Sequence, residues 1–317
     1  MEEKSMVGYG MSAGKMKLIA SVAMFIDHFA ASVLLRLIRL KDTPLKAWLQ
    51  AYTANYEGVL EGLEVFYQIL RDIGRISFPI YCFFIVEGFF HTKSRGKYAF
   101  RLFMLALISD IPFDLALFGK INDFKHQNVY FTLLIGLGAI WGINALREKA
   151  AQFKIKEFLL LLEVGIVYVS TVLAFFLKTD YSILGVLCIV IMYQIKVPYK
   201  EFASERLLLL SAGLAVWWQF KNPASFLLSF VITLLAIIML GIFLLRFRSM
   251  YVLMVFGGIL CLCVTGVSEL PAVFAMALMY WYNGKKGKNP KWFFYFFYPV
   301  HLAVLAAVCV TLGLIKL

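Results

Sequence analysis

Charged residues are scarce in this sequence. They make up 16% of the 317 residues, whereas hydrophobic residues make up 62%, and the mean hydropathy is +0.81. A soluble domain of average composition is about one quarter charged and about half apolar. The scarcity of charge therefore excludes a soluble globular enzyme, a disordered protein and a disulfide scaffold, and it requires several membrane spans. A porin-type barrel is excluded as well, because the apolar runs are continuous rather than alternating.

Cysteine is also rare, and its positions argue against disulfides and metal sites. All five cysteines lie inside apolar runs, which is typical of buried, unpaired thiols. Cys261 and Cys263 are separated by a single residue, which is not a usual metal-ligand spacing, so we expect no metal. The sequence shows no cleavable signal peptide, no linker and no clear internal repeat, and we interpret residues 1–317 as one domain.

Eleven apolar segments account for most of the chain. Segments of about 20 apolar residues cross a bilayer as helices, so the sequence predicts an all-α polytopic membrane protein with about 10–11 transmembrane helices. The approximate limits of the segments are 17–40, 74–91, 98–118, 129–147, 157–177, 182–195, 206–219, 224–245, 250–265, 271–282 and 293–315.

Lysines and arginines concentrate on one side of the predicted membrane. If the spans alternate in direction, the loops on the side of the N-terminus hold about twice as many basic residues as the other loops. The positive-inside rule then places the N-terminus in the cytoplasm and the C-terminus outside, in a multi-pass protein of the inner (plasma) membrane. The net charge of +12 follows from these loops. Since the basic residues form neither one face nor a known motif, we expect no nucleic-acid partner.

Residues 41–73 form the only sizeable loop between the apolar segments. This loop carries five acidic residues, and Leu60, Leu63 and Tyr67 recur in it at helical spacing. The pattern predicts an amphipathic extracytoplasmic helix that lies on the membrane or caps a cavity.

Ionisable side chains inside the apolar segments are candidates for function, because charge is costly in a bilayer. The set is small and consists of Asp27, His28, Arg75, Glu87, Asp110, Asp114, Glu163, Glu269 and His301.

Lys17 and His28 share one face of the first predicted span. Eleven helical steps advance about 16–17 Å and turn about 20° beyond three full turns. Lys17 would lie at the cytoplasmic interface and His28 near the middle of the bilayer, which suits a cationic anchor for an anionic cofactor and a base at depth. The alternative for His28 is a core histidine that is hydrogen-bonded for packing. Asp27 could orient His28 or pair with Arg75.

Two further segments carry polar pairs four residues apart, a spacing that puts both side chains on one helix face. Glu87 and His91 form the first pair, and a solvated interfacial histidine is the alternative for His91. Asp110 and Asp114 form the second pair, and two carboxylates on one face favour acid–base chemistry or the orientation of a histidine. Asn128 adds a polar group in the same depth range.

The last loop and the last segment contain a basic cluster and a histidine. Lys285, Lys286 and Lys288 lie in a glycine-containing cytoplasmic loop that could hold phosphates or act only as a topology signal. His301 follows an aromatic run and a proline, about two to three turns into the segment, and is a candidate cavity residue.

Five stretches together resemble the TraX family of pilin acetylases. They are the first segment from Lys17 to His28, GRISFPIYCFFIVEGF at residues 74–89, SDIPFD at 109–114, YNGKKG at 282–287 and FFYFFYPVHL at 293–302. The resemblance runs from about residue 15 to 305, and the stretch 150–270 is generic. The interval from Lys17 to His28 is also similar to the membrane acyltransferase-3 group, which carries a basic residue, ten residues and then a histidine that is proposed to be catalytic.

The resemblance implies a membrane acyltransferase that moves an acetyl group from cytoplasmic acetyl-CoA to an amine or hydroxyl. The implied acceptor is a peptide, a pilin-like protein or a glycan, and membrane lipid surrounds the protein. On this hypothesis His28 is the general base, and the residues that orient it or assist it are Asp27, Asp110 and Asp114.

The same hypothesis assigns the other polar residues to two groups. The anionic end of acetyl-CoA would be bound by basic side chains, namely Lys17, Lys285, Lys286 and Lys288. The substrate cavity would be lined by side chains from several spans, namely Arg75, Glu87, His91, Asn128 and His301.

A secondary transporter is the alternative from another class, since intramembrane carboxylates and histidines also make proton relays. Transporters often show internal repeats, and none is visible here. A scaffold protein without chemistry fits poorly with so many buried charges. Dependence on acetyl-CoA, rather than on an ion gradient, would distinguish the enzyme from the transporter.

Overall fold

The computed structural model describes residues 10–39, 44–121, 123, 125–153, 159–197, 250–263, 267–287 and 291–315. Within these ranges the chain is helical and contains no strand, which confirms the predicted all-α class. Each predicted apolar segment inside the described ranges coincides with a helix, and the segments 206–219 and 224–245 lie outside them.

The described helices begin, in chain order, with those of residues 13–196. They are α1 (Ala13–Phe29), a π-helical segment (Ala30–Leu34), α2 (Leu35–Arg39), α3 (Pro44–Tyr52), α4 (Tyr56–Gly74), α5 (Ser77–His91), α6 (Arg95–Phe113), a second π-helical segment (Asp114–Phe118), α7 (Val129–Phe153), α8 (Leu159–Phe176) and α9 (Ser182–Lys196). The later part of the chain contributes α12 (Met250–Cys263), a 3₁₀ segment (Val267–Val273), α13 (Phe274–Tyr280) and α14 (Lys291–Thr311).

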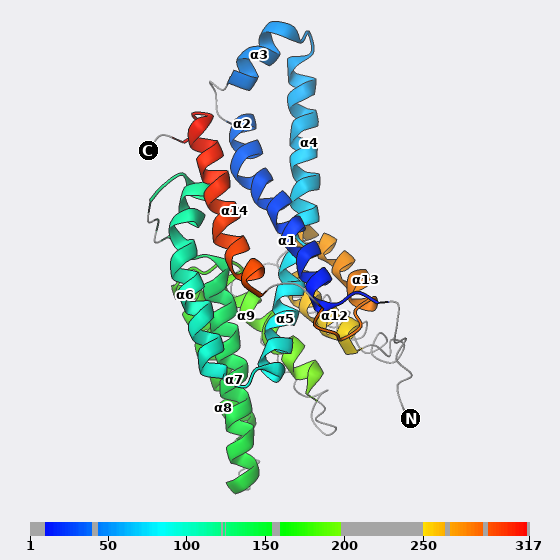
Figure 1. Cartoon of the computed structure of the whole chain (residues 1–317), viewed down its shortest axis with the longest axis vertical. Helices are drawn as coiled ribbons and strands as arrows, with labels where there is room; N and C mark the ends of the chain where they lie inside the picture. The colour runs from blue at the N-terminus through cyan, green and yellow to red at the C-terminus, as the bar shows by residue number, and fades with distance from the viewer. Residues whose placement is uncertain are drawn as a thin grey trace, which may run out of the picture.

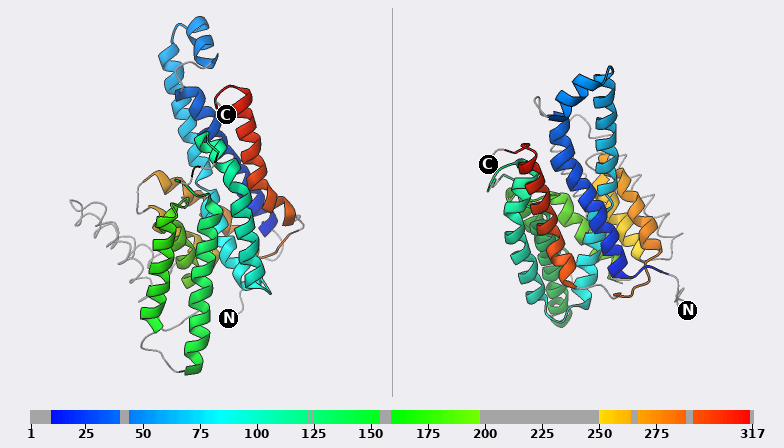
Figure 2. Two further views of the ribbon diagram at one scale, coloured as in Figure 1. Left: turned by 90° about the vertical axis from the view of Figure 1, so that its left-hand side faces the viewer. Right: turned by 45° about the horizontal axis from the view of Figure 1, so that its top comes forward.

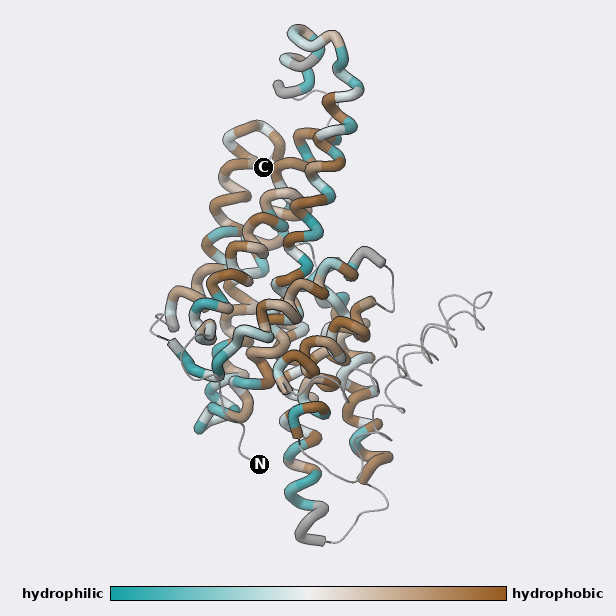
Figure 3. The backbone as a smooth tube through the Cα atoms, turned by 90° about the vertical axis from the view of Figure 1, so that its right-hand side faces the viewer, coloured by the Kyte–Doolittle hydropathy of each residue, from teal (hydrophilic) through white to brown (hydrophobic). Residues whose placement is uncertain are grey.

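Five helical stretches of the described chain are long and apolar enough to cross a membrane, and some of them combine consecutive elements. By length and composition they are Ala13–Arg39, Tyr56–His91, Val129–Lys149, Leu159–Phe176 and Trp292–Thr311. Three shorter apolar helices, Ser182–Lys196, Met250–Cys263 and Glu269–Tyr280, accompany them. The described part of the chain is therefore a multi-pass membrane protein, and Figure 3 shows hydrophobic residues along most of the middle of the bundle.

The first and last helices of the described chain are neighbours. Figure 1 shows α1 and α14 side by side and running in the same direction, and the two helices are in contact. Helix α6 packs on the other side of α14, and α5 lies between α1 and the pair α9 and α12. Residues from the two ends of the sequence can therefore build one site.

The predicted amphipathic segment 41–73 contains two helices, α3 and α4. Helix α4 packs along α1 and leads directly into α5, so that residues 56–91 form one candidate span of 36 residues. In Figures 1 and 2, α4 runs along the bundle and α3 projects beyond it. The last turns of α4 face a cavity, as described below.

A buried ion pair holds α8 to its neighbours. The Arg147 guanidinium on α7 donates to both carboxylate oxygens of Glu163 on α8, at 2.6 and 2.9 Å, and to Gln194 on α9 at 2.7 Å. Most of the remaining surface of α8 is exposed and apolar. The polar contact therefore ties α8 to both helices that it packs against, α7 and α9.

Replacing Glu163 should destabilise the bundle strongly. Glu163→Ala leaves the Arg147 guanidinium buried without its carboxylate, which costs about 3–5 kcal/mol when one partner of a buried pair is removed. Thermal unfolding in detergent measures the loss. Glu148→Ala is the control, because Glu148 is exposed and its Arg95 partner is 3.9 Å away. Equal effects of the two substitutions would contradict the assigned role of the buried pair.

Candidate functional site

The basic loop before α14 is hydrogen-bonded to the start of α1. The backbone N–H of Ala13 donates to the Lys285 carbonyl at 2.8 Å, and that of Gly14 donates to the Lys286 carbonyl at 3.1 Å. First-turn N–H groups have no partner within their own helix, so the loop carbonyls satisfy them. This pairing brings Lys286 to the same end of α1 as Lys17, and Lys288 lies outside the described residues.

Lys17 lines a small cavity at this end of the bundle. The cavity has a volume of about 160 Å³, and its wall includes Lys17, Lys286, Phe84 and Tyr98. We call it the Lys17 cavity. The Lys17 ammonium lies 4.7 Å from the centre of the Phe84 ring, and it has no carboxylate partner among the described residues. Two lysines beside one apolar cavity form a ready site for an anion.

A larger cavity lies farther along α1 and contains His28. Its volume is about 450 Å³, and we call it the His28 cavity. Asp27 and His28 come from α1, Arg71 from α4, Arg75 from the junction of α4 and α5, and Asp180 from the loop before α9. The end of α4 therefore forms part of the wall, as the prediction of a capping helix allowed.

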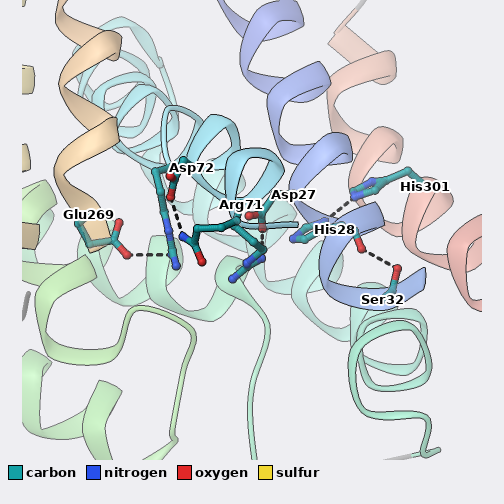
Figure 4. Close-up of polar contacts among 9 residues, drawn as sticks. Asp27, His28, Ser32, Arg71, Asp72, Glu269 and His301 are labelled. Carbon is teal, nitrogen blue, oxygen red and sulfur yellow. Dashed lines mark hydrogen bonds and ion pairs between the residues drawn. The ribbon is translucent and has the colours of Figure 1, made fainter. Parts of the chain in front are cut away.

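His28 is paired with His301, and the pairing fixes the tautomers of the neutral rings. The Nδ1 of His301 lies 2.7 Å from the Phe297 carbonyl oxygen, which can only accept, so this Nδ1 carries a proton. The Nε2 of neutral His301 is then an acceptor, and the Nδ1 of His28, 2.7 Å away, must donate to it. Figure 4 shows this contact between α1 and α14. The Nε2 of His28 is left with a free lone pair, as a general base requires.

A local change in helix geometry follows His28. The chain becomes π-helical over Ala30–Leu34, and the Ser32 hydroxyl donates to the His28 carbonyl at 2.5 Å. Arg36 then donates to the carbonyls of Ser32 and Ala116, the latter in the second π-helical segment. Single π-helical turns often occur at functional sites. Here the Arg36 hydrogen bonds connect the π-helical segment after His28 to the one that follows α6.

Asp27 does not orient His28, although the sequence allows this role. The Asp27 carboxylate instead accepts a hydrogen bond from Arg71 at 2.6 Å, and Arg75 pairs with Glu269 at 2.8 Å. Figure 4 shows the pair of Asp27 with Arg71 and the separate His28–His301 contact. Adjacent residues point about 100° apart on a helix, so Asp27 faces α4 while His28 faces α14. The predicted pairing of Asp27 with Arg75 is also wrong.

Gly74 permits the close approach of α4 to Asp27. A Cβ atom at this position would lie 2.2 Å from the Asp27 Cβ. Any larger residue would therefore push the carboxylate away from Arg71.

Asp110, Asp114 and Asn128 form a separate structural cluster. The Asn128 amide donates to the Ala106 carbonyl at 2.8 Å and to Asp110 at 3.2 Å. Asp114 accepts the backbone N–H of Asp123 at 2.6 Å. None of the three predicted residues lines the His28 or the Lys17 cavity. The predictions that these carboxylates orient His28 and that Asn128 lines the cavity are not met, because their partners are backbone groups and one another.

Glu87 and His91 lie away from both cavities. Glu87 is buried and accepts a hydrogen bond from Lys196 on α9, and His91 lies 3.3 Å from it and is exposed. The pair shares a helix face, as its spacing predicts, but it holds α5 to α9. The assignment of both residues to the substrate cavity is therefore wrong for this structure.

Comparison with known proteins places the sequence in a family. A family model described as TraX protein matches residues 12–250. The chain belongs to the TraX family. It is also similar to a probable fimbrial assembly protein FimC, serogroup H1, from Dichelobacter nodosus, with 26% identity over 305 residues that cover 93% of this chain and 95% of that protein. No solved structure matches the chain.

Residues 12–250, which match the TraX model, include most of the wall of the His28 cavity. His301 lies after this range in the sequence. Two residues matter here for which the sequence patterns indicate no role, Arg71 and Glu269. Arg71 falls in the predicted loop 41–73, so the sequence does not predict its contact with Asp27 on the first span. Glu269 was recognised as an intramembrane charge, and that signal alone could have indicated a basic partner.

Nitrogen NMR of the histidines tests the assigned tautomers. The chain has four histidines, so selective ¹⁵N labelling resolves them. We expect His28 and His301 to show the Nδ1–H tautomer in the neutral protein. His301→Ala should remove one such signal and shift the other, and His91→Ala should leave both unchanged. A neutral His28 protonated at Nε2 would contradict the assignment of a free base at that atom.

Proposed function

We propose that this protein is an integral-membrane acyltransferase of the inner membrane, which moves an acetyl group from cytoplasmic acetyl-CoA to an amine or hydroxyl acceptor. The observation that carries the proposal is the pair of adjoining cavities along one face of α1. One contains two lysines without a described acidic partner, and the other contains a histidine with a free Nε2. A donor and an acceptor can therefore approach His28 from two directions.

The Lys17 cavity suits the donor by its chemistry. Coenzyme A carries phosphates at one end and a thioester at the other. Lys17 and Lys286 supply positive charge at the mouth, and Lys285 lies exposed beside them in the loop. Phe84 and Tyr98 line the interior with apolar surface for the pantetheine arm. The positive-inside rule places this end of α1 in the cytoplasm, where acetyl-CoA is made available.

The histidine pair supplies the acid–base chemistry. When bound, acetyl-CoA supplies an activated acyl thioester. The Nε2 of His28 accepts the proton that the attacking amine or hydroxyl loses. The Nδ1–H of His28 keeps its hydrogen bond to the Nε2 of His301. The Phe297 carbonyl holds His301 in the tautomer that accepts this bond. The proton on Nε2 is then given to the departing sulfur.

The His28 cavity suits a polar acceptor. Two of its side chains, Asp27 and Thr179, each have a buried oxygen without a hydrogen-bond partner among the described residues. Buried polar atoms of this kind are normally satisfied, which supports a ligand with hydrogen-bond donors. The name of the FimC relative points to fimbrial assembly, so a pilin-like protein is our first choice of acceptor, ahead of another peptide or a glycan.

Binding of acetyl-CoA to the purified protein is the first test. A ligand present at about 100 times its Kd stabilises the folded state by about 2.7 kcal/mol, so thermal unfolding in detergent should shift upward with the cofactor. Lys17→Ala and Lys286→Ala should weaken this effect. Lys15→Ala is the matched control, because Lys15 is exposed on the same helix turn and lines neither cavity. No shift at millimolar acetyl-CoA would overturn the proposal and favour the transporter.

Replacement of the proposed base tests the chemistry. His28→Ala should lower the rate of transfer by at least about 100-fold, within the range that general-base catalysis contributes. Acetyl-CoA binding should persist, because Lys17 and Lys286 are unchanged. His301→Ala should give a smaller loss, and His91→Ala should have no effect on transfer. Full turnover in His28→Ala would exclude His28 as the base.

A further inference from the structure

Four side chains form a wall that the two cavities share. Tyr81 from α5, Tyr130 and Leu133 from α7 and Phe294 from α14 line both the Lys17 cavity and the His28 cavity. We call these four residues the collar. Tyr130 and Leu133 are buried, and Tyr81 and Phe294 are partly buried. Three of the four are aromatic, so a group that goes from one cavity to the other must pass mainly flat, rigid rings.

The collar stands between Lys17 and His28. Tyr81 and Ser21 share a hydrogen bond of 2.8 Å. Ser21 lies about one turn after Lys17 and two turns before His28, on the same face of α1. A group that moves along this face from Lys17 to His28 must therefore pass the ring of Tyr81.

Tyr130, from α7, is held by contacts with α14. Its hydroxyl donates to the Tyr295 carbonyl at 3.5 Å. That carbonyl is free of its usual helical partner because Pro299, four residues later, has no N–H. The Tyr130 ring also meets Tyr298 edge to face at 5.0 Å. Tyr298 in turn contacts the His28 ring, so the collar is packed against the base.

We propose that the collar is the specificity-determining element for the acyl donor, because it admits an unbranched acyl group and excludes one that is branched next to the carbonyl. The inference rests on the proposed function. The phosphates of the donor lie at Lys17, so the acyl group is the leading end that enters the collar. Tyr81 and Tyr130 can move aside only by losing their hydrogen bonds, and Leu133 is buried between its neighbours, so the collar selects by cross-section.

Binding of two acyl-CoA esters to the full-length protein tests the inference without an acceptor. The probes are acetyl-CoA and isobutyryl-CoA, which differ by two methyl groups at the carbon next to the carbonyl. Isobutyryl-CoA should bind the unchanged protein at least about tenfold more weakly, because extra methyl groups in a filled space are strongly disfavoured. Leu133→Ala should reduce this ratio to less than about threefold.

Matched substitutions separate the collar from general packing. Leu137→Ala removes a buried leucine one turn along α7 that lines neither cavity, so the ratio should stay that of the unchanged protein. Phe294→Ala is a second test, with its neighbour Phe293→Ala as control, in case Leu133→Ala does not fold. Phe294 lines both cavities, and Phe293 is exposed and lines neither.

Each outcome either supports the collar or overturns it. A ratio that falls in Leu133→Ala or Phe294→Ala, but not in the controls, supports it. Equal affinity of the two esters for the unchanged protein, or equal ratios in variants and controls, overturns the collar and leaves the proposed function standing. If neither ester nor free coenzyme A binds the unchanged protein, the proposed function fails and the collar fails with it.

Discussion

The hydrogen bond between His28 and His301 is the contact on which the rest of the site depends. It joins the first and last helices of the described chain, and it assigns the proton of each neutral ring. The backbone pairing of residues 13–14 with residues 285–286 holds α1 and the loop before α14 together on one side of this bond. On the other side, Arg36 contacts Ala116 in the second π-helical segment and Cys309 on α14. Without that alignment, the Nε2 of His28 would have no defined protonation and the two cavities would not share a wall.

The local geometry of α1 could be predicted from sequence, because helical spacing alone decides which residues share a face. Lys17 and His28 do lie along one face and line adjoining cavities. The partners of the intramembrane charges could not be predicted, since they come from distant segments. Arg71 is paired with Asp27 from 44 residues away, and Lys196 with Glu87 from 109 residues away. Spacing within one helix carries no information about such pairs.

The site also depends on breaks in regular helical structure, which sequence patterns indicate poorly. Pro299 is visible in the sequence, and its effect on the Tyr295 carbonyl follows from its missing N–H. The π-helical segment after His28 has no comparable signal, because its residues are ordinary helix formers. It is accompanied by a tertiary contact that sequence patterns do not indicate, in which the Arg36 side chain reaches the Ala116 carbonyl in the second π-helical segment.

Pairing of the first helix with the last has a consequence for biosynthesis. A membrane protein inserts its helices in the order in which the ribosome makes them, so α1 waits in the bilayer while more than 260 residues follow. During that interval His28 has no His301 beside it, and the first turn of α1 has no loop carbonyls to receive its N–H groups. The nascent chain therefore holds no assembled histidine pair, and the site is completed when α14 is inserted.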